Sequence, residues 1–566
     1  MRLKSKKIVL FSLLPLLLQS CNKGDTSTIN ITWWNNYFVP EKESDRNDTN
    51  KYGLYLFAEK AIQEFEAKHP NVKITTSYYK DYGAINTVIK AGKDSGNIPA
   101  LALGYPDYAK NYLNEGIPLS NLNDFISDSK IGFSKQAKEE ATFYSDDLDT
   151  NYEEDLSSSY SDLIENYMNI EKSMYGQNEL YSMPFSKSGE VLFINDSVFS
   201  KVGAGEAGST SKNQYATYIP PISIDSKTKY ELIENYTIVD LMNIAKKIQN
   251  DYPSIFPVDA SGNPLYLDEN ENRKIFTAIP LVLDSSDNLF ITLCEQLNID
   301  YINPNGKNVN EKILFNNDEA KQVVKQLKKW SDEGLFCTRD QLSYSDTEKK
   351  YHTYGTAYFE GGRTMMIALS TPNAQYFAED GYVSKVYKYP QYTKEAFNLE
   401  NSKQEKYSVI SQGPSMLFFK NKDKRVERAS FEFYKYLTSS DNSAKLALAN
   451  NYFPIRKSSY ENENIKEIRD NGASKENSII LSSSIKDKQD VLYSKIYDYN
   501  MNYADNNDYF MTQATTYSST VRSAVKEMMI TILSDKTHKT DEEITDLVNT
   551  AFKTAYDHVL NTENID

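Results

Sequence analysis

Residues 29–78 constrain the fold most, because their apolar positions change periodicity twice. Apolar and polar residues alternate over 29–33, as they do in a strand with one buried face. Over 54–65 the apolar residues recur every three or four positions, the pattern of an amphipathic helix, and Pro70 ends that helix. Alternation resumes over 72–78. A strand, a helix and a second strand in this order predict a parallel sheet covered by helices, which is an α/β fold.

The length of the chain exceeds what one hydrophobic core can use. The chain has 566 residues, of which 40% are apolar, so we expect two large folded lobes and not global disorder. Apolar residues at helical spacing over 521–532 predict a late helix, and short apolar strands are predicted at 191–194, 364–369 and 415–419.

The charge and the metal-binding residue types exclude several function classes. The net charge is −16, and an acidic surface repels nucleic acid and anionic lipid, so we expect no nucleic-acid partner. Four histidines and three cysteines have no metal-ligand spacing, so neither a metal nor a cofactor is predicted. Cys294 and Cys337 could form a disulfide or remain two separate thiols.

The first twenty residues have the pattern of a secretory signal peptide. A basic start precedes an apolar run over 8–18, and that run is shorter than the roughly 20 residues that span a bilayer. Residues 18–21 resemble the lipobox of bacterial lipoproteins, although Gln19 departs from its commonest form. This resemblance implies a signal peptide over 1–20, a lipid on Cys21 and a tether over 21–28. The expected location is the extracellular face of the bacterial membrane, reached through the lipid anchor only.

The rest of the chain carries a series of short motifs. They lie at residues 31–34, 65–74, 95–99, 181–195, 361–366, 412–415, 431–438 and 451–458. Their order and spacing are similar to those of the family-1 extracellular solute-binding proteins, the branch of maltose-binding and glycerol-3-phosphate-binding proteins. Ala100 stands where that family usually has an aspartate, and Asn451 stands where it has a glycine.

This resemblance implies a two-lobed periplasmic-binding-protein-like fold, in which each lobe is a mostly parallel sheet flanked by helices and several hinge crossings join the lobes. Lobe 1 would comprise residues 29–186 and 415–454, and lobe 2 residues 188–413 and 456–566. The implied function is to bind a carbohydrate in the cleft between the lobes and to deliver it to the permease subunits of an ABC transporter by hinge closure. The family is not enzymatic, and we expect a monomer.

The candidate ligand-binding residues combine flat aromatic rings with fixed polar groups, as a sugar site requires. They lie at predicted strand ends, where open α/β sheets bind ligands, or in the implied crossings. The set is Trp33, Trp34, Asp81, Tyr82, Asp107, Ser186, Ser188, Glu190, Ser370, Asn373, Gln412, Ser415 and Arg456. Other roles stay open for several of these residues. In an alternating strand one of Trp33 and Trp34 must face the core, and Asp81 and Asp107 could be ordinary turn residues, because aspartate is common in turns. Glu190 could be a solvated hinge charge, and Arg456 could pair with a carboxylate across the hinge.

Other functions also stay open on the sequence. Glycerol-3-phosphate or another sugar-phosphate ester would need a cationic site, for which Arg456 is the candidate, with Ser186 and Ser188 beside it. A glycan-hydrolysing enzyme needs two carboxylates at a set separation, but the chain has neither a GxSxG elbow nor metal-ligand spacing. A surface adhesin would share the signal and the anchor but would need no crossings.

Overall fold

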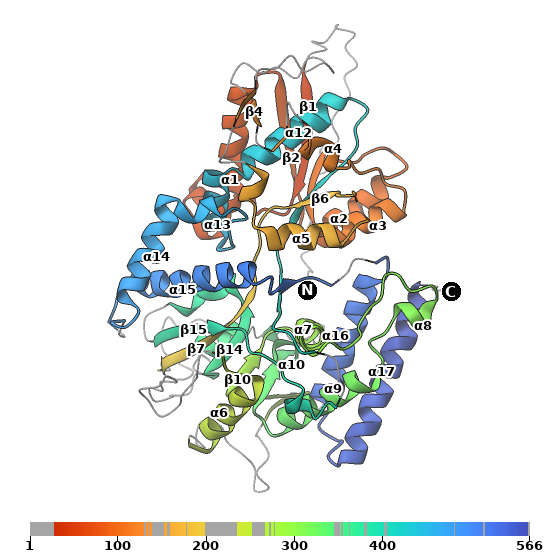
Figure 1. Ribbon diagram of the computed structural model, residues 1–566. Helices are drawn as coiled ribbons and strands as arrows, with labels where there is room; N and C mark the ends of the chain where they lie inside the picture. The colour runs from red at the N-terminus through yellow and green to blue at the C-terminus, as the bar shows by residue number, and fades with distance from the viewer. Residues whose placement is uncertain are drawn as a thin grey trace, which may run out of the picture.

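The computed structural model describes residues 28–563 apart from 129–131, 134, 138–151, 155–158, 177, 199–234, 252–265, 271–272, 277, 345–350, 353–354, 361–362, 379–381, 401–403, 480–481 and 513–514. The predicted signal peptide, Cys21 and the first two residues of the motif at 361–366 lie outside the described residues. The described chain forms two lobes, with helix α15 (Ile485–Asp505) running across the boundary between them (Figure 1).

Lobe 1, the upper body in Figure 1, is built on a five-stranded sheet with the order β2-β1-β3-β17-β6. Its strands are β1 (Ile29–Asn35), β2 (Val72–Tyr78), β3 (Leu101–Gly104), β6 (Ser182–Pro184) and β17 (Ser415–Phe418). Its helices are α1 (Thr49–Lys68), α2 (Tyr82–Gly92), α3 (Pro106–Asn114), α4 (Asn123–Ile126), α5 (Glu165–Ser173), α12 (Lys424–Leu437) and α13 (Ser440–Asn450). Helix α1 joins the parallel strands β1 and β2, so the predicted β-α-β unit is confirmed.

Lobe 2 is built on a second five-stranded sheet, with the order β11-β10-β14-β7-β15. Its strands are β7 (Glu190–Val198), β10 (Leu281–Leu283), β11 (Phe336–Thr338), β14 (Met366–Ser370) and β15 (Tyr382–Lys388). Its main helices are α6 (Ile238–Asp251), α7 (Ser286–Leu297), α9 (Asp318–Asp332), α16 (Ser518–Ser534) and α17 (Asp541–Glu563). Cys294 and Cys337 are both buried, and both are free thiols.

One strand of each sheet runs against the other four. In lobe 1 this strand is β17, which is antiparallel to β3 and β6, and in lobe 2 it is β7, which is antiparallel to β14 and β15. Both strands enter their lobe directly from the other lobe, so they begin at the hinge and run away from it. The remaining strands end at the hinge. The expectation of two mostly parallel sheets flanked by helices is therefore confirmed, with the exception in each sheet explained by the crossing.

Three backbone segments lie side by side where the lobes meet, and we call them hinge segments 1, 2 and 3. They are residues 186–188, 412–414 and 451–453. The N–H groups of Ser188 and Gln412 donate to each other's carbonyl oxygens, at 2.9 and 2.8 Å, and the N–H of Phe453 donates to the carbonyl of Lys187 at 2.7 Å. Hinge segment 1 is thus the middle strand of a small hydrogen-bonded hinge.

The chain stays beside lobe 1 beyond hinge segment 3. The N–H of Ile164 donates to the carbonyl of Ile455 at 3.0 Å, and the N–H of Lys457 donates to the carbonyl of Asp162 at 2.9 Å. The chain then passes through α14 (Glu463–Lys475) and α15 to reach α16 in lobe 2. Among the described residues, no helix combines the length and apolarity needed to span a bilayer.

Candidate functional site: the interlobe cleft

The carboxyl ends of the parallel strands in both sheets face the boundary between the lobes. In lobe 1, Asp81 and Tyr82 follow β2, and Tyr105 and Asp107 follow β3. In lobe 2, β10 leads into the first turn of α7. Open α/β sheets bind their ligands at this edge, so the candidate site is the cleft between the two edges.

Lobe 1 contributes a cluster of tyrosine rings, which we call the tyrosine wall: Tyr82, Tyr105 and Tyr108. Tyr105 contacts the other two rings edge-on, with centroids 5.2 Å from Tyr82 and 5.5 Å from Tyr108. All three residues are partly exposed, and burial raises the pKa of Tyr108 to about 12, so its hydroxyl stays protonated. Tyr452, from hinge segment 3, adds to the effect of burial in raising the pKa values of Tyr82 and Tyr105, so it lies close to both.

Asp107 is the acidic group beside this wall. Its Oδ1 accepts a hydrogen bond of 3.0 Å from the backbone N–H of Tyr108, in the first turn of α3. Burial raises the pKa of Asp107 to about 6, although that hydrogen bond and the positive charge of Arg522 both act to lower it. The carboxyl group is therefore partly protonated near neutral pH and can donate or accept a hydrogen bond.

Lobe 2 contributes a chain of linked polar side chains. Asn288 Nδ2 donates to Glu190 Oε1 at 2.6 Å, and Asn288 Oδ1 accepts a hydrogen bond from Nη2 of Arg522. Arg522 Nε lies 2.6 Å from Asp287 Oδ2. Glu190 and Asn288 are buried, at 5% and 3% exposure, whereas the Arg522 side chain is 36% exposed. Asp287 and Asn288 therefore fix the guanidinium of Arg522, part of which stays exposed to solvent.

The carboxyl groups of lobe 2 respond differently to their surroundings. Burial raises the pKa of Glu190 to about 8; Asp284 and Asp287 push it further up, whereas Asn288 and Arg522 push it down. Burial also raises the pKa of Asp284. Burial acts in the same direction on Asp287, but the charge of Arg522 and the hydroxyl of Ser285 outweigh it, and the pKa of Asp287 is lowered. Asp287 is thus the ionised partner of Arg522, and Glu190 is the neutral one at pH 7.

Arg522 connects the two sides of the cleft electrostatically. Although it belongs to lobe 2, its positive charge opposes the effect of burial on the pKa values of Asp107, Tyr105 and Tyr108 in lobe 1. A direct bond also joins the lobes, because Asn451 Nδ2 donates to Gln375 Oε1 at 3.2 Å, between hinge segment 3 and the turn that follows β14.

A groove with a volume of about 640 Å³ also lies between the lobes, and neither the tyrosine wall nor Arg522 lines it. Ser173 at the end of α5 lines it from lobe 1, and Cys294 of α7 lines it from lobe 2, together with residues 299–305 and 510–512. Tyr301 lines the groove, and its hydroxyl is buried with no hydrogen-bond partner among the described residues. Burial raises the pKa of Tyr301 and the charge of Arg522 opposes this rise, so Tyr301 lies within electrostatic range of Arg522, although Arg522 does not line the groove. This volume falls within the roughly 300–1,000 Å³ typical of small-molecule sites.

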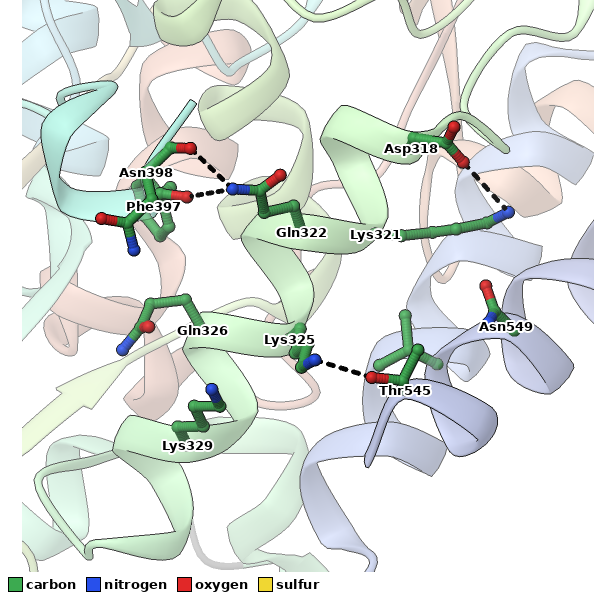
Figure 2. Close-up of a pocket in the computed structure, with 11 residues that line it drawn as sticks. Asp318, Lys321, Gln322, Lys325, Gln326, Lys329, Phe397, Asn398, Thr545 and Asn549 are labelled. Carbon is green, nitrogen blue, oxygen red and sulfur yellow. Dashed lines mark hydrogen bonds and ion pairs between the residues drawn. The ribbon is translucent and has the colours of Figure 1, made fainter. Parts of the chain in front are cut away.

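A second pocket, of about 480 Å³, lies within lobe 2, and its lining residues are drawn in Figure 2. It lies between α9, α17 and the turn at Phe397, and Lys321, Lys325 and Lys329 line it. Two of these lysines already bind Asp541, at 2.6 and 2.5 Å. Because no residue of lobe 1 lines this pocket, it is separate from the cleft.

The structure brings part of the predicted set together at the cleft. Tyr82 and Asp107 lie on the lobe 1 side, and Glu190 lies on the lobe 2 side. Ser188 and Ser370 meet at the hinge end, where the Ser370 hydroxyl donates to the Ser188 hydroxyl at 3.3 Å.

Other predicted residues form hydrogen bonds with the backbone around the cleft. Asp81 is exposed and caps α2, accepting a hydrogen bond from the N–H of Ala84 at 2.8 Å. Asn373 donates to the carbonyl of Ser370 at 2.9 Å. Gln412 pairs through its backbone with hinge segment 1.

Two predicted serines lie inside the hinge. Ser186 is 2% exposed and accepts a hydrogen bond from Asn450 at 2.9 Å. Ser415 is fully buried, where it accepts a hydrogen bond from Lys187 at 3.0 Å and donates to Glu171.

Trp33 and Arg456 have no exposed surface in this arrangement of the lobes. Trp33 packs in the lobe 1 core, with its ring 5.7 Å from that of Phe433, and the tryptophan beside it, Trp34, is 6% exposed. Arg456 donates to the carbonyl of Ser159 at 2.8 Å and also to the carbonyl of Thr438. Strand alternation explains the first placement, and the backbone pairing of Arg456 with Leu163 of lobe 1, beyond hinge segment 3, explains the second.

The sequence analysis did not identify Tyr105, Tyr108, Asn288, Tyr452 or Arg522. The two tyrosines flank Asp107, so the rule that selected Asp107 could have selected them too. Asn288 follows β10, a strand of three residues that is too short to show alternation. Arg522 lies on a helix, and no strand-end rule applies there.

Among the described residues, no group of three or more His, Cys, Asp or Glu side chains is placed to hold a metal ion. The cleft itself offers hydrogen-bonding groups and aromatic surface.

Comparison with protein families places the chain. A family model described as bacterial extracellular solute-binding protein matches residues 60–473. The cyclic alpha-maltosyl-1,6-maltose binding protein of Arthrobacter globiformis superposes with a TM-score of 0.55 at 12% identity, over 94% of this chain and 99% of that one. The ABC substrate-binding protein Lmo0181 of Listeria monocytogenes, in complex with cycloalternan, gives 0.54 at 13% identity, over 95% and 100%.

UgpB of Mycobacterium tuberculosis, in complex with glycerophosphocholine, gives a TM-score of 0.51 at 11% identity, over 94% of this chain and 99% of that one. At these identities the likeness shows the two-lobed fold alone. Comparison with curated protein sequences found no match. The family model, which covers most of the chain, and the shared fold lead to one conclusion: the chain belongs to the bacterial extracellular solute-binding proteins.

Proposed function

We propose that this protein binds a neutral carbohydrate in the interlobe cleft and passes it to an ABC importer. The observation that carries the proposal is the tyrosine wall of lobe 1 opposite the linked polar side chains of lobe 2. A sugar offers C–H groups on its ring faces, which pack against aromatic rings, and hydroxyls at its edges, which bind polar groups. The carbohydrate ligands of the Arthrobacter and Listeria proteins are consistent with this choice.

The charges in the cleft favour a neutral sugar over a sugar-phosphate ester. Arg522 is the cation that reaches across the cleft, and its Nε already pairs with Asp287; Glu190 is neutral at pH 7, but Asp107 and Asp284 add two more acidic groups. A phosphate would meet more negative than positive charge there. The arginine that the sequence suggested for a phosphate is fully buried.

Delivery would depend on hinge closure. A solute that contacts both walls favours the closed arrangement by its extra affinity for it, and about 5.5 kcal/mol would convert a mostly open population into a mostly closed one. Permease subunits would then recognise the closed form. We further propose export by the signal at 1–20 and anchoring of a monomer at the extracellular face through a lipid on Cys21, with more than one acyl chain for stable attachment.

A thermal-shift screen tests the proposal directly. The mature protein is expected to gain stability with one or a few members of a panel of maltose, maltotriose, mannotriose and related neutral sugars, because a ligand that binds only the folded state raises the unfolding temperature. Glycerol 3-phosphate serves as the anionic arm. A shift with the phosphate alone would overturn the neutral-sugar proposal, silence across the panel would favour an adhesin, and cleavage of a glycan would favour an enzyme.

Replacing Tyr105 with alanine should weaken the binding of the sugar found in that screen by about tenfold, because it removes the central ring of the tyrosine wall. Isothermal titration calorimetry measures this effect. Tyr436→Ala is the matched control, because Tyr436 is also a partly exposed ring in an aromatic pair but lies on α12, beside Phe65. Equal sugar affinities for Tyr105→Ala and Tyr436→Ala would show that the tyrosine wall does not contact the sugar.

A further inference from the structure

Three side chains connect the hinge to the cleft in lobe 2. Glu190 is the first residue of β7, directly after hinge segment 1, and its Oε1 accepts the 2.6 Å bond from Asn288 Nδ2. The other end of the Asn288 amide, Oδ1, accepts from Arg522. Because Glu190 needs the donor and Arg522 needs the acceptor, the amide has one orientation that satisfies both partners.

We propose that Glu190 and Asn288 form a positioning relay for Arg522, and that Arg522 is the residue of lobe 2 that donates hydrogen bonds to the oxygen atoms of the bound solute. The inference rests on the proposed function for its ligand. A guanidinium has five N–H donors, and the bonds to Asp287 and Asn288 do not use all of them. The side chain is 36% exposed and acts on Asp107 across the cleft, so donors remain on the side where a solute would bind.

Asp287 and Asn288 hold Arg522 in different ways. The ion pair with Asp287 neutralises the guanidinium, and the bond from Nη2 to Asn288 fixes its direction. An arginine that is neutralised and aimed in this way suits the neutral hydroxyls of a sugar better than a free anion.

Ionisation of Glu190 would disturb the relay. The groups that face it are Asp284 after β10, Asp287 of α7, Arg522 of α16, and Tyr389 and Tyr392 after β15. Arg522 is the one cation in this set, so an added negative charge on Glu190 would draw the guanidinium back toward lobe 2 and away from the solute. Affinity is therefore expected to decline as the pH rises through about 8, where burial places the pKa of Glu190.

A charge-exchange experiment tests the relay. Asn288→Leu removes both bonds and should weaken sugar binding about tenfold, the effect of one hydrogen bond to a charged group. Asn288→Asp leaves Glu190 without its amide donor, so one proton must bridge the two carboxyl groups. That variant should bind well at about pH 6 and lose at least tenfold by about pH 9. The double variant Glu190→Gln/Asn288→Asp restores a donor at every pH, so its profile should be flat.

The relay would be overturned if Asn288→Leu bound as tightly as wild type, or if Asn288→Asp and the double variant had the same pH profile. Thermal unfolding of the ligand-free proteins supplies a second readout: wild type should lose stability as the pH rises toward about 8, because burial raises the pKa of Glu190, Asn288→Asp should lose more between about pH 6 and pH 9, and the double variant should lose least. Glu333→Gln, an exposed carboxylate at the end of α9 that pairs with Lys246 and lines neither pocket, is the control and should change neither profile. If no sugar binds wild type while the unfolding profiles differ as expected, the carbohydrate proposal fails and the relay stands.

Discussion

Replacement of Lys187 with methionine is expected to lower the free energy of unfolding by about 3–5 kcal/mol, the usual effect of removing one partner of a buried ion pair. Lys187 is the middle residue of hinge segment 1 and is fully buried. Its Nζ lies 3.2 Å from Glu171 Oε1 and 3.0 Å from Ser415 Oγ. Methionine fills a similar volume but leaves the carboxylate of Glu171, which is also fully buried, without its cation. Urea denaturation of the two proteins measures the difference.

Two further variants show whether the loss comes from the unpaired charge. Lys187→Met/Glu171→Gln removes the charge and keeps one oxygen that accepts from the hydroxyl of Ser182 or Ser415, while the new amide N–H can donate to the other hydroxyl, so it should recover a large part of the lost stability. Lys60→Met breaks the exposed pair with Glu64, whose side chains are 70% and 43% exposed, and should change stability by less than about 0.5 kcal/mol. A Lys187→Met protein as stable as Lys60→Met would show that this pair does not stabilise the hinge.

The sequence allowed the fold class to be predicted, because strands and helices have different periodicities. The β-α-β unit at the start of the chain is long and regular, and the structure reproduces it. The antiparallel strands β7 and β17 could not be predicted from periodicity, because alternation reports which face of a strand is buried and not the direction in which the strand runs. Their direction follows from the point at which the chain enters each lobe.

The candidate site was predictable only in part on both sides of the cleft, since two of the three rings of the tyrosine wall, Tyr105 and Tyr108, were missed in lobe 1. Asp107 and Tyr82 follow long or well-marked strands, so the strand-end rule selects them. Asn288 follows a strand of three residues, and Arg522 comes from a helix more than 200 residues further along the chain. Only the tertiary structure brings Asn288 and Arg522 together, because local sequence patterns do not predict contacts between distant parts of the chain.

Asn451 shows how a departure from a family motif can preserve the backbone. It stands where the related motif has glycine, and it adopts a left-handed conformation, with φ of 56°, at the end of α13. Asparagine tolerates this region better than other residues with a side chain. Its amide also reaches Gln375 in lobe 2, a contact that glycine could not make.

Replacement of Gly413 with alanine is expected to lower the free energy of unfolding by about 3 kcal/mol or more, because two separate effects add. Gly413 has a φ of +98°, which residues with a side chain rarely adopt. A Cβ atom at this position would also lie 2.2 Å from the carbonyl oxygen of Ser186 and 3.0 Å from the Cα of Lys187. Both atoms belong to the backbone of hinge segment 1, so a rotamer change cannot relieve the contact.

The alanine must therefore push hinge segments 1 and 2 apart, and with them the lobes that these segments join. Urea denaturation gives the loss of stability, and small-angle scattering should show a changed radius of gyration in the ligand-free protein. Gly96→Ala separates the two effects, because Gly96 also has a positive φ, +71°, but no atom lies within 4 Å of the added Cβ. That control should lose only about 1 kcal/mol, the cost of the backbone conformation. Equal losses for the two variants would mean that the hinge segments separate without cost, so close packing would not be what fixes the lobes.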